Sequence, residues 1–193
     1  MIWRILRLID RLARVRLRFL QWLELYRTGG GVHYPKSTSF AARVYFRGSR
    51  GKIEVGEGVE FGHAATKPGE SLVVQARAKD SQILIGSDCH FSAGVSLVAN
   101  RSIEIGDGLL CGAHVTIVDC DFHPVLPEER RTGCGAIAPV KIGSNVWLGD
   151  GVKVLKGVAI GDGAVVAAGA IVVDDVPPRA IAAGIPARIV KRM

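Results

Sequence analysis

Residues 142–177 read IGSNVW LGDGVK VLKGVA IGDGAV VAAGAI VVDDVP, six hexapeptides that follow one another without a break. Every first position is aliphatic: Ile142, Leu148, Val154, Ile160, Val166 and Val172. Every fifth position is small or branched: Val146, Val152, Val158, Ala164, Ala170 and Val176. A period of six fits neither a helix of about 3.6 residues per turn nor a single amphipathic strand. It predicts short parallel strands joined by tight turns, three per coil, with the first positions stacked inside a solenoid.

The same phase returns upstream of this stretch, so the repeat covers most of the chain. It is seen in VGEGVE (55–60), FGHAAT (61–66), IGSDCH (85–90), FSAGVS (91–96), IGDGLL (105–110) and CGAHVT (111–116). A two-residue slip lies near Asn100–Arg101. Residues 67–82 are less regular, with Lys67 and Lys79 at inward positions, which predicts a distorted or looped coil there. The 24 glycines suit corners where the backbone needs a positive φ.

The N-terminal segment carries most of the charge of the chain. The formal net charge is +7, and residues 1–27 hold seven arginines against Asp10 and Glu24, a net of +5. Arginine interrupts each apolar run, which excludes a spanning helix and a signal peptide. We expect residues 1–30 to form a basic amphipathic helix and a glycine-rich linker, and residues 31–193 to form the β-helix domain. The helix suits an anionic membrane surface, or packing on protein; both remain open.

The composition excludes several classes of function. Because the excess of basic charge is concentrated in residues 1–27, a nucleic-acid partner is not expected. The four cysteines form no CxxC pair and have no zinc-site spacing, so we expect no disulfide and no metal site. A cytoplasmic location follows, with peripheral contact at the inner face of the membrane if the helix binds lipid.

One segment breaks the repeat. From Ile117 to Ile142 the sixfold count is one position too long, and residues 119–139 (DCDFHPVLPEERRTGCGAIAP) cannot form regular rungs. An excursion of this length is usually functional or disordered. His123 suits the general base of an acyl transfer to a hydroxyl or amine, because its ordinary pKa is near neutrality. Asp119 or Asp121 could orient its imidazole, and the sequence leaves that choice open.

The hexapeptides at roughly 51–191 resemble the left-handed β-helix acyltransferase superfamily. DCDFHP and the stretch 144–192 are similar to its sugar and polysaccharide O-acetyltransferases, which include maltose, galactoside and nodulation-factor enzymes. The resemblance implies an all-β left-handed parallel β-helix with a short C-terminal cap, a homotrimer, and direct transfer from acetyl-CoA with His123 as base. It implies that Trp147 lines the active site. The implied cofactor contacts are Gly149, Ala167 and Ala168 beside the pantetheine arm, and Arg188, Arg179 and Lys191 at the phosphates.

The chain departs from those enzymes in two places. Asp174 and Asp175 stand where many relatives have a basic residue, and Ser92 and Gly94 stand where the galactoside and maltose enzymes have asparagines. We therefore expect a different acceptor pocket. The candidate substrate-binding residues are Ser92, His90 and His114.

The function expected from the sequence is O-acetylation of a surface polysaccharide or its lipid-linked precursor. The alternative acceptors are an amino sugar, serine or an antibiotic. A non-catalytic scaffold also remains open, as does a carbonic-anhydrase-like metal protein that would use His90, His114 and His123.

Overall fold

The computed structural model describes residues 31–46, 50–63 and 70–193. The helix predicted for residues 1–30, with its membrane or protein contact, lies outside these residues, as does Lys67. All regular secondary structure in the described residues is β-strand. That part of the chain contains no helix that could span a membrane.

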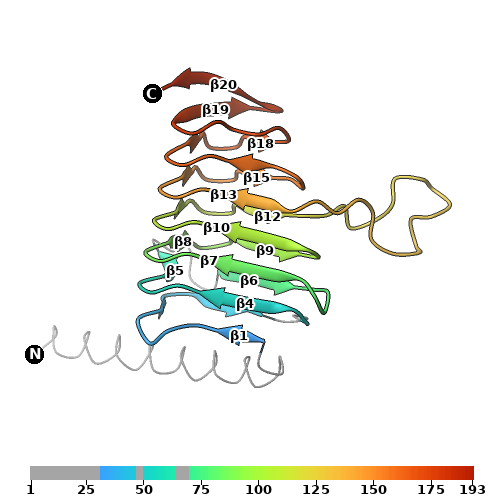
Figure 1. Ribbon diagram of the computed structural model, residues 1–193, viewed down its shortest axis with the longest axis horizontal. Coiled ribbons are helices and arrows are strands. Elements are labelled where there is room, and N and C mark those ends of the chain that lie inside the picture. The colour runs from blue at the N-terminus through green and yellow to red at the C-terminus, as the bar shows by residue number, and fades with distance from the viewer. Residues whose placement is uncertain (1–30, 47–49, 64–69) are drawn as a thin grey trace, which may run out of the picture.

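The described strands form three sheets that wrap around one interior (Figure 1). Sheet I contains β1 (Val32–His33), β4 (Lys52–Val55), β7 (Gln82–Ile85), β10 (Ser102–Ile105), β13 (Val140–Ile142) and β16 (Ala159–Ile160). Sheet II contains β2 (Ser39–Phe40), β5 (Glu60–His63), β8 (His90–Ser92), β11 (Leu110–Cys111), β14 (Trp147–Leu148), β17 (Val165–Val166), β19 (Ala180–Gly184) and β20 (Ala187–Arg192). Sheet III contains β3 (Arg43–Tyr45), β6 (Ser71–Ala76), β9 (Ser96–Ala99), β12 (Thr116–Val118), β15 (Lys153–Val154) and β18 (Ile171–Val172).

The chain visits sheets I, II and III in turn, and the strand register gives the length of each coil. Lys141 pairs with Ala159 and Trp147 pairs with Val165, so a regular coil is three hexapeptides long. Neighbouring strands pair in parallel, except β19 and β20, which pair antiparallel and cap the C-terminal end. The period of six therefore corresponds to one face of a three-sided coil, as the sequence predicts.

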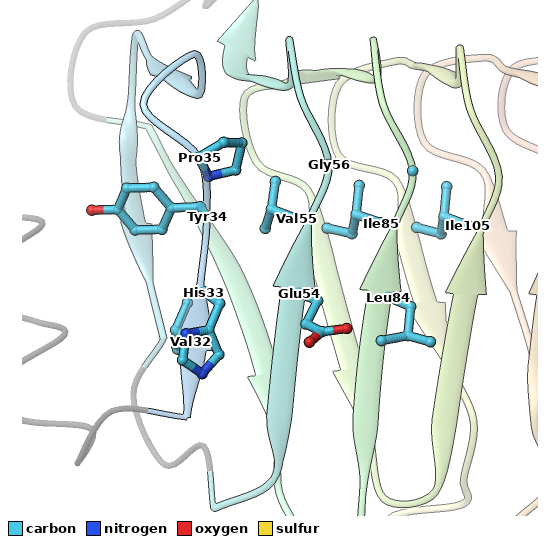
Figure 2. A pocket seen from close by; sticks show the side chains of 11 residues that line it. Val32, His33, Tyr34, Pro35, Glu54, Val55, Gly56, Leu84, Ile85 and Ile105 are labelled. Carbon is cyan, nitrogen blue, oxygen red and sulfur yellow. The ribbon is translucent and has the colours of Figure 1, made fainter.

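The interior is filled by the aliphatic positions of the repeat. All first and fifth positions of residues 142–177 are at most 3% exposed. Toward the N-terminus the column becomes aromatic, because Phe61 stacks on Phe40 and on Phe91 with ring centroids 5.6 and 5.2 Å apart. Figure 2 shows the inward row of sheet I, where Val55 and Ile85 lie in line with Ile105. Burial of these columns is the main force that holds successive coils together.

The corner between sheets III and I, here called the III–I corner, varies in length from coil to coil. A regular coil would pair Ile83 with Arg101, but its partner is Ile103, which confirms the two-residue slip between β9 and β10. In the next coil the register would pair Ile103 with Asp121, but its partner is Val140. The additional residues leave the coil after β12 as a loop that projects from the side of the stack (Figure 1). Lys79 is exposed at the corner between β6 and β7.

Candidate active site

The loop of residues 119–139 leaves the solenoid through a short antiparallel neck. The amide of Ala138 donates to the carbonyl of Asp119 at 2.8 Å, and the amide of Asp121 donates to the carbonyl of Ala136 at 2.8 Å. The amide of Gly135 returns a hydrogen bond to the carbonyl of Asp121 at 2.9 Å. A Cβ at Gly135 would lie 2.5 Å from the carbonyl oxygen of His123, so this position requires glycine. The neck therefore fixes the backbone at His123.

Residues of the two preceding III–I corners hold the base of the loop. The guanidinium of Arg77 lies 4.9 Å from the ring centroid of Phe122, in a cation–π contact. The side-chain amide of Asn100 approaches the sulfurs of Cys120 and Cys134 at 2.8 and 3.1 Å. Residues of the irregular III–I corners, Arg77 and Asn100, thus contact the loop at its base.

His123 is exposed, and its ring is oriented by the backbone of the same loop. Its Nδ1 lies 2.9 Å from the carbonyl oxygen of Arg130, which can only accept, so Nδ1–H is the donor. Arg130 is held in turn, because its Nη2 donates to the carbonyl of Val125 at 3.2 Å. In the neutral ring the lone pair is then on Nε2, which is the arrangement a general base needs.

Asp119 does not orient His123 in this structure; it closes the corner of the preceding coil. The side chain is fully buried, and its two carboxylate oxygens accept the backbone amides of Asn100 and Arg101 at 2.7 and 2.6 Å. These are the residues of the slip, where the chain makes a turn that the repeat does not provide for. The role predicted for Asp119 as an orienting carboxylate is replaced by a structural one.

Asp121 also has another partner. Its Oδ1 accepts a hydrogen bond from Lys156 Nζ at 2.8 Å, and both side chains are about one-third exposed. Lys156 belongs to the III–I corner of the following coil, so this ion pair ties the neck of the loop to the coil above it. The carbonyl of Arg130, rather than either carboxylate, sets the tautomer of His123.

The residues predicted to line the cofactor path lie on sheet II and at its corner with sheet III. Trp147 projects outward from β14 and is 55% exposed. Gly149 follows β14, and a Cβ there would lie 2.6 Å from the backbone nitrogen of Ala168 in the next coil. Close stacking of the coils alone therefore requires glycine at 149. Ala167 is half-buried and Ala168 is exposed.

The basic residues predicted to meet the cofactor phosphates lie at the same C-terminal end. Arg188 and Lys191 are exposed on β20, and Arg179 is exposed just before β19 with a φ of 54°. Arg188 Nη1 donates to Asp174 Oδ2 at 2.9 Å. Asp174 is one of the two acidic residues that stand where many related enzymes have a basic residue. It therefore pairs with Arg188, the arginine that the resemblance places at the cofactor phosphates.

His123 and Trp147 lie on different sides of the solenoid. The loop emerges where sheet III passes to sheet I, and in a three-sided coil this corner is opposite the face of sheet II. Within one chain the structure does not bring the candidate base to the candidate cofactor residues.

The candidate substrate residues lie in two successive coils, on β8 and just after β11. His90 lies on β8 and Ser92 ends that strand. His114 lies one coil further along, with a φ of 57° and its Nε2 3.5 Å from Glu70 Oε1. Within the described residues of one chain, His90, His114 and His123 do not form a common metal-binding group, so this chain alone does not contain the zinc site considered for them.

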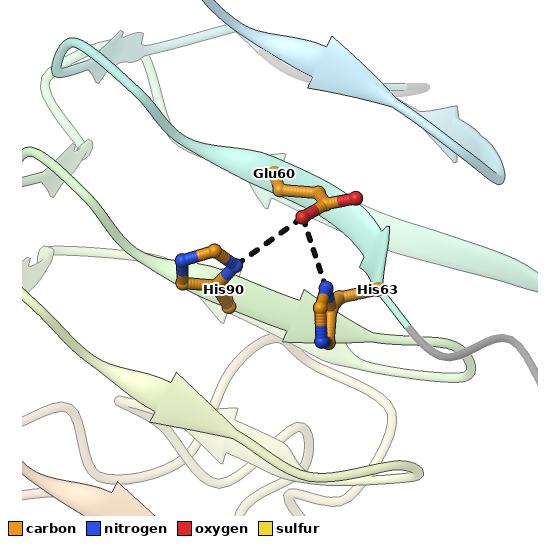
Figure 3. Close-up of polar contacts among 3 residues, drawn as sticks. All are labelled: Glu60, His63 and His90. Carbon is orange, nitrogen blue, oxygen red and sulfur yellow. Dashed lines mark hydrogen bonds and ion pairs between the residues drawn. The ribbon is translucent and has the colours of Figure 1, made fainter.

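His90 instead belongs to a cluster that the sequence did not predict (Figure 3). Glu60 Oε2 accepts from His63 Nδ1 at 2.9 Å and from His90 Nδ1 at 3.3 Å. The hydrogen bond from His63 is the main reason that the pKa of Glu60 lies below its usual value, with a smaller contribution from His90. The signal that could have revealed it is Gly62 within the strand pattern, since an isolated glycine there often marks a bulge.

A separate groove lies elsewhere, on sheet I (Figure 2). It has a volume of about 720 Å³ and is lined by residues of β1, β4, β7 and β10, among them Glu54, and by Tyr34 just after β1. No predicted site residue lines it, so the loop and sheet II, rather than this groove, remain the candidate active site.

Comparison with known proteins gives consistent matches. Residues 139–174 match the family described as bacterial transferase hexapeptide (six repeats). Galactoside O-acetyltransferase of Escherichia coli (strain K12) is 38% identical over 113 residues, which are 58% of this chain and 55% of that protein. Polysialic acid O-acetyltransferase of Escherichia coli O1:K1 / APEC is 40% identical over 115 residues, which are 59% of this chain and 38% of that protein.

A solved structure of a galactoside acetyltransferase in complex with coenzyme A matches at a TM-score of 0.54 and 26% identity, covering 93% of this chain and 80% of that one. This chain spans about half or less of the length of the two curated relatives. The matches confirm the resemblance to sugar O-acetyltransferases and the predicted left-handed parallel β-helix.

Proposed function

We propose that this protein is an acetyl-CoA-dependent O-acetyltransferase, with His123 as general base and a sugar hydroxyl as acceptor. The acceptor proposed is a surface polysaccharide or its lipid-linked precursor. The main observation behind this proposal is the hydrogen bond from His123 Nδ1 to the carbonyl of Arg130, at 2.9 Å. The loop that carries both residues is fixed by the antiparallel neck at its base. The hydrogen bond leaves Nε2 as the basic atom, on an exposed residue that lies outside the core of the solenoid.

The residues of the loop suit direct transfer. In the proposed reaction His123 Nε2 takes the proton of the acceptor hydroxyl as the hydroxyl oxygen bonds to the acyl carbon. Nε2 then returns this proton to the departing sulfur as the carbon–sulfur bond breaks, so that atoms and charge balance. The carbonyl of Arg130 holds the ring in one tautomer throughout and stabilises the transient imidazolium. Acetyl-CoA supplies the acetyl group as a thioester.

The corner between sheets II and III fits an extended cofactor arm. Ala167 and Ala168 present only methyl groups there, so a chain can run close to the backbone. Arg179, Arg188 and Lys191 are exposed at the same end and would meet phosphates. The Arg188–Asp174 pair is well exposed, at 63% and 71%, so a phosphate can displace the carboxylate at small cost.

We further propose a homotrimer whose active sites lie between chains. His123 lies at the III–I corner and Trp147 on the opposite face, so a single chain does not contain both halves of the site. A threefold arrangement would bring the III–I corner of one chain against sheet II of the next. The curated relatives act on galactoside and polysialic acid by their names, which supports a carbohydrate acceptor.

The test measures thiol release from acetyl-CoA with a panel of sugar and polysaccharide acceptors. His123→Ala should lower kcat by about 10²–10⁴-fold, the usual contribution of a general base, while CoA binding measured by calorimetry is retained. His33→Ala, an exposed histidine on sheet I, is the matched control and should be unaffected. Normal turnover of His123→Ala would place the base elsewhere, and wild-type protein that binds no CoA would overturn the acetyltransferase proposal itself.

A further inference from the structure

Glu60, His63 and His90 converge on the outer face of sheet II, on the N-terminal coils (Figure 3). Glu60 and His63 belong to β5, and His90 belongs to β8 in the next coil. Each side chain offers one ligand atom, and these three atoms all lie within 4.8 Å of one another. Two imidazoles and one carboxylate therefore share one small area of an open face.

The backbone is built to bring these groups together. Glu60 and His90 are direct partners in the parallel register, so their side chains stand side by side on the outer face. His63 would face the interior if β5 alternated regularly from Glu60. Gly62 prevents this, because it adopts a φ of +90° and the register shifts between Phe61 and His63. A bulge of this kind turns the next side chain to the other face, here beside Glu60.

The position of the bulge leaves no room for a side chain at residue 62. A Cβ at Gly62 would lie 2.4 Å from the backbone nitrogen of Ala42 and 2.5 Å from its Cβ. The rings of His63 and His90 meet edge to face, with centroids 5.1 Å apart and an interplanar angle of 75°. The cluster is therefore fixed by the backbone and by ring packing, and not only by its hydrogen bonds.

The distances suit a small tetrahedral ion. Metal bonds of about 2.0–2.1 Å in a tetrahedron place neighbouring ligand atoms roughly 3.3–3.4 Å apart. Glu60 Oε2 already lies 2.9 Å from His63 Nδ1 and 3.3 Å from His90 Nδ1. Two nitrogens and one oxygen are a ligand set of zinc and neighbouring divalent ions, with a fourth position left for water. The side chains of His63 and His90 are 53% and 38% exposed, so in the single chain this position faces solvent.

We propose that Glu60, His63 and His90 form a binding site for a divalent transition-metal ion of the zinc class. The ion takes the place of the two Nδ1 hydrogens that now point at Glu60, and the protons move to Nε2. It links β5 to β8 at the bulge and thereby stabilises the N-terminal coils, since anything that binds only the folded state raises its stability. Within one chain the site is separate from the loop of His123, and Zn²⁺ binding is measured independently of acetyl transfer.

The test uses the full chain, freed of metal with a chelator and titrated with Zn²⁺ by calorimetry. The wild type should bind one Zn²⁺ per chain and melt at a higher temperature in its presence. His63→Asn, His90→Asn and Glu60→Gln should each weaken the affinity at least about tenfold, since each removes a metal ligand. His33→Asn is the matched control and should bind as the wild type does.

A second experiment needs no variant of the three ligands, so it does not depend on whether those variants fold. It also tests whether the ion binds at a cysteine instead. Co²⁺ added to the unmutated chain should give the visible absorption of a site with nitrogen and oxygen ligands, without a thiolate charge-transfer band. Cys134→Ser should leave Zn²⁺ binding unchanged. Absence of Zn²⁺ binding by the wild type, a thiolate band, or full affinity in His63→Asn and His90→Asn would each overturn the proposal.

Discussion

The carboxylate of Asp119 accepts the backbone amide of Arg101 at 2.6 Å, across one III–I corner of the solenoid. The second carboxylate oxygen accepts the neighbouring amide of Asn100 at 2.7 Å. The first residue of the DCDFHP motif is thus the buried closure of the preceding coil, while His123, further along the same motif, is exposed. The motif joins a structural residue to the proposed general base, and mutation can separate the two roles.

Replacement of Asp119 by Asn should mainly reduce stability. The amide presents a donor to one of the two buried backbone N–H groups, and loss of a charged, buried hydrogen bond costs about 3 kcal/mol. Urea unfolding measures this. Asp150→Asn is the control, because Asp150 accepts the amide of Ala113 at 2.8 Å at an exposed corner; it should lose about 1 kcal/mol. A folded Asp119→Asn protein that keeps wild-type stability but loses kcat would restore an orienting role for this residue.

Replacement of Lys156 by Met tests the other aspartate of the motif. The Lys156–Asp121 pair is partly exposed, so the free energy of unfolding should change by less than about 1 kcal/mol. Asp121→Asn should have a similarly small effect on stability and on kcat. A loss of about 10²-fold or more in kcat for Asp121→Asn, without one for Lys156→Met, would show that Asp121 acts on His123 in the assembled enzyme.

Replacement of Asp174 by Asn should tighten CoA binding. The change removes the carboxylate that now pairs with Arg188 Nη1 at 2.9 Å, and leaves the guanidinium free for a phosphate. Exposed pairs contribute about 0.2–1 kcal/mol, so the dissociation constant should fall roughly up to fivefold. Calorimetry with CoA measures it, with Arg188→Ala as the opposite control. Weaker binding by Asp174→Asn would mean that Arg188 does not meet the phosphates.

Cysteine reactivity should separate the two thiols at the neck of the loop. Burial raises the pKa of Cys120 to about 12, and its hydrogen bond with Cys134 adds to the shift. The thiolate is the reactive form, so iodoacetamide under mildly alkaline conditions should modify exposed Cys134 and spare Cys120 in the folded protein. Peptide mass spectrometry identifies the site. Equal labelling of both would contradict the burial seen here.

Mixing two inactive variants tests whether the site lies between chains. His123→Ala and Trp147→Ala should each be impaired, but hybrid trimers contain interfaces that join an intact His123 to an intact Trp147. For random mixing in equal amounts about a quarter of the interfaces are of this kind, so about a quarter of the activity should return. Absence of recovery, with hybrids shown by native mass spectrometry, would place both residues in one chain's site or outside it.

The repeat made the fold readable from the sequence. The aliphatic first position and the small fifth position describe the interior directly, because each hexapeptide forms one side of the coil. The slip at Asn100–Arg101 and the break after Val118 were visible as departures from that count.

The partners at the loop could not be read in the same way. Arg130 orients His123 through its backbone carbonyl. Every residue type has this group, so the sequence does not show which residue will be the partner. Asp119 and Asp121 are carboxylates of the kind that can orient a histidine. In the structure, however, Asp119 accepts hydrogen bonds from backbone amides of the corner, and Asp121 accepts one from Lys156. Glu60 and His63 meet only because of the bulge at Gly62, a conformation that spacing alone does not predict.

The reversed direction of β20 has a consequence for assembly. A stack of parallel coils can in principle be continued by another molecule, since each coil presents the next with the same row of amides and carbonyls. β20 runs against β19, so the last edge no longer matches the first coil of another copy. Along sheet II the β19–β20 hairpin therefore presents an antiparallel edge, which does not continue the parallel pairing of the coils.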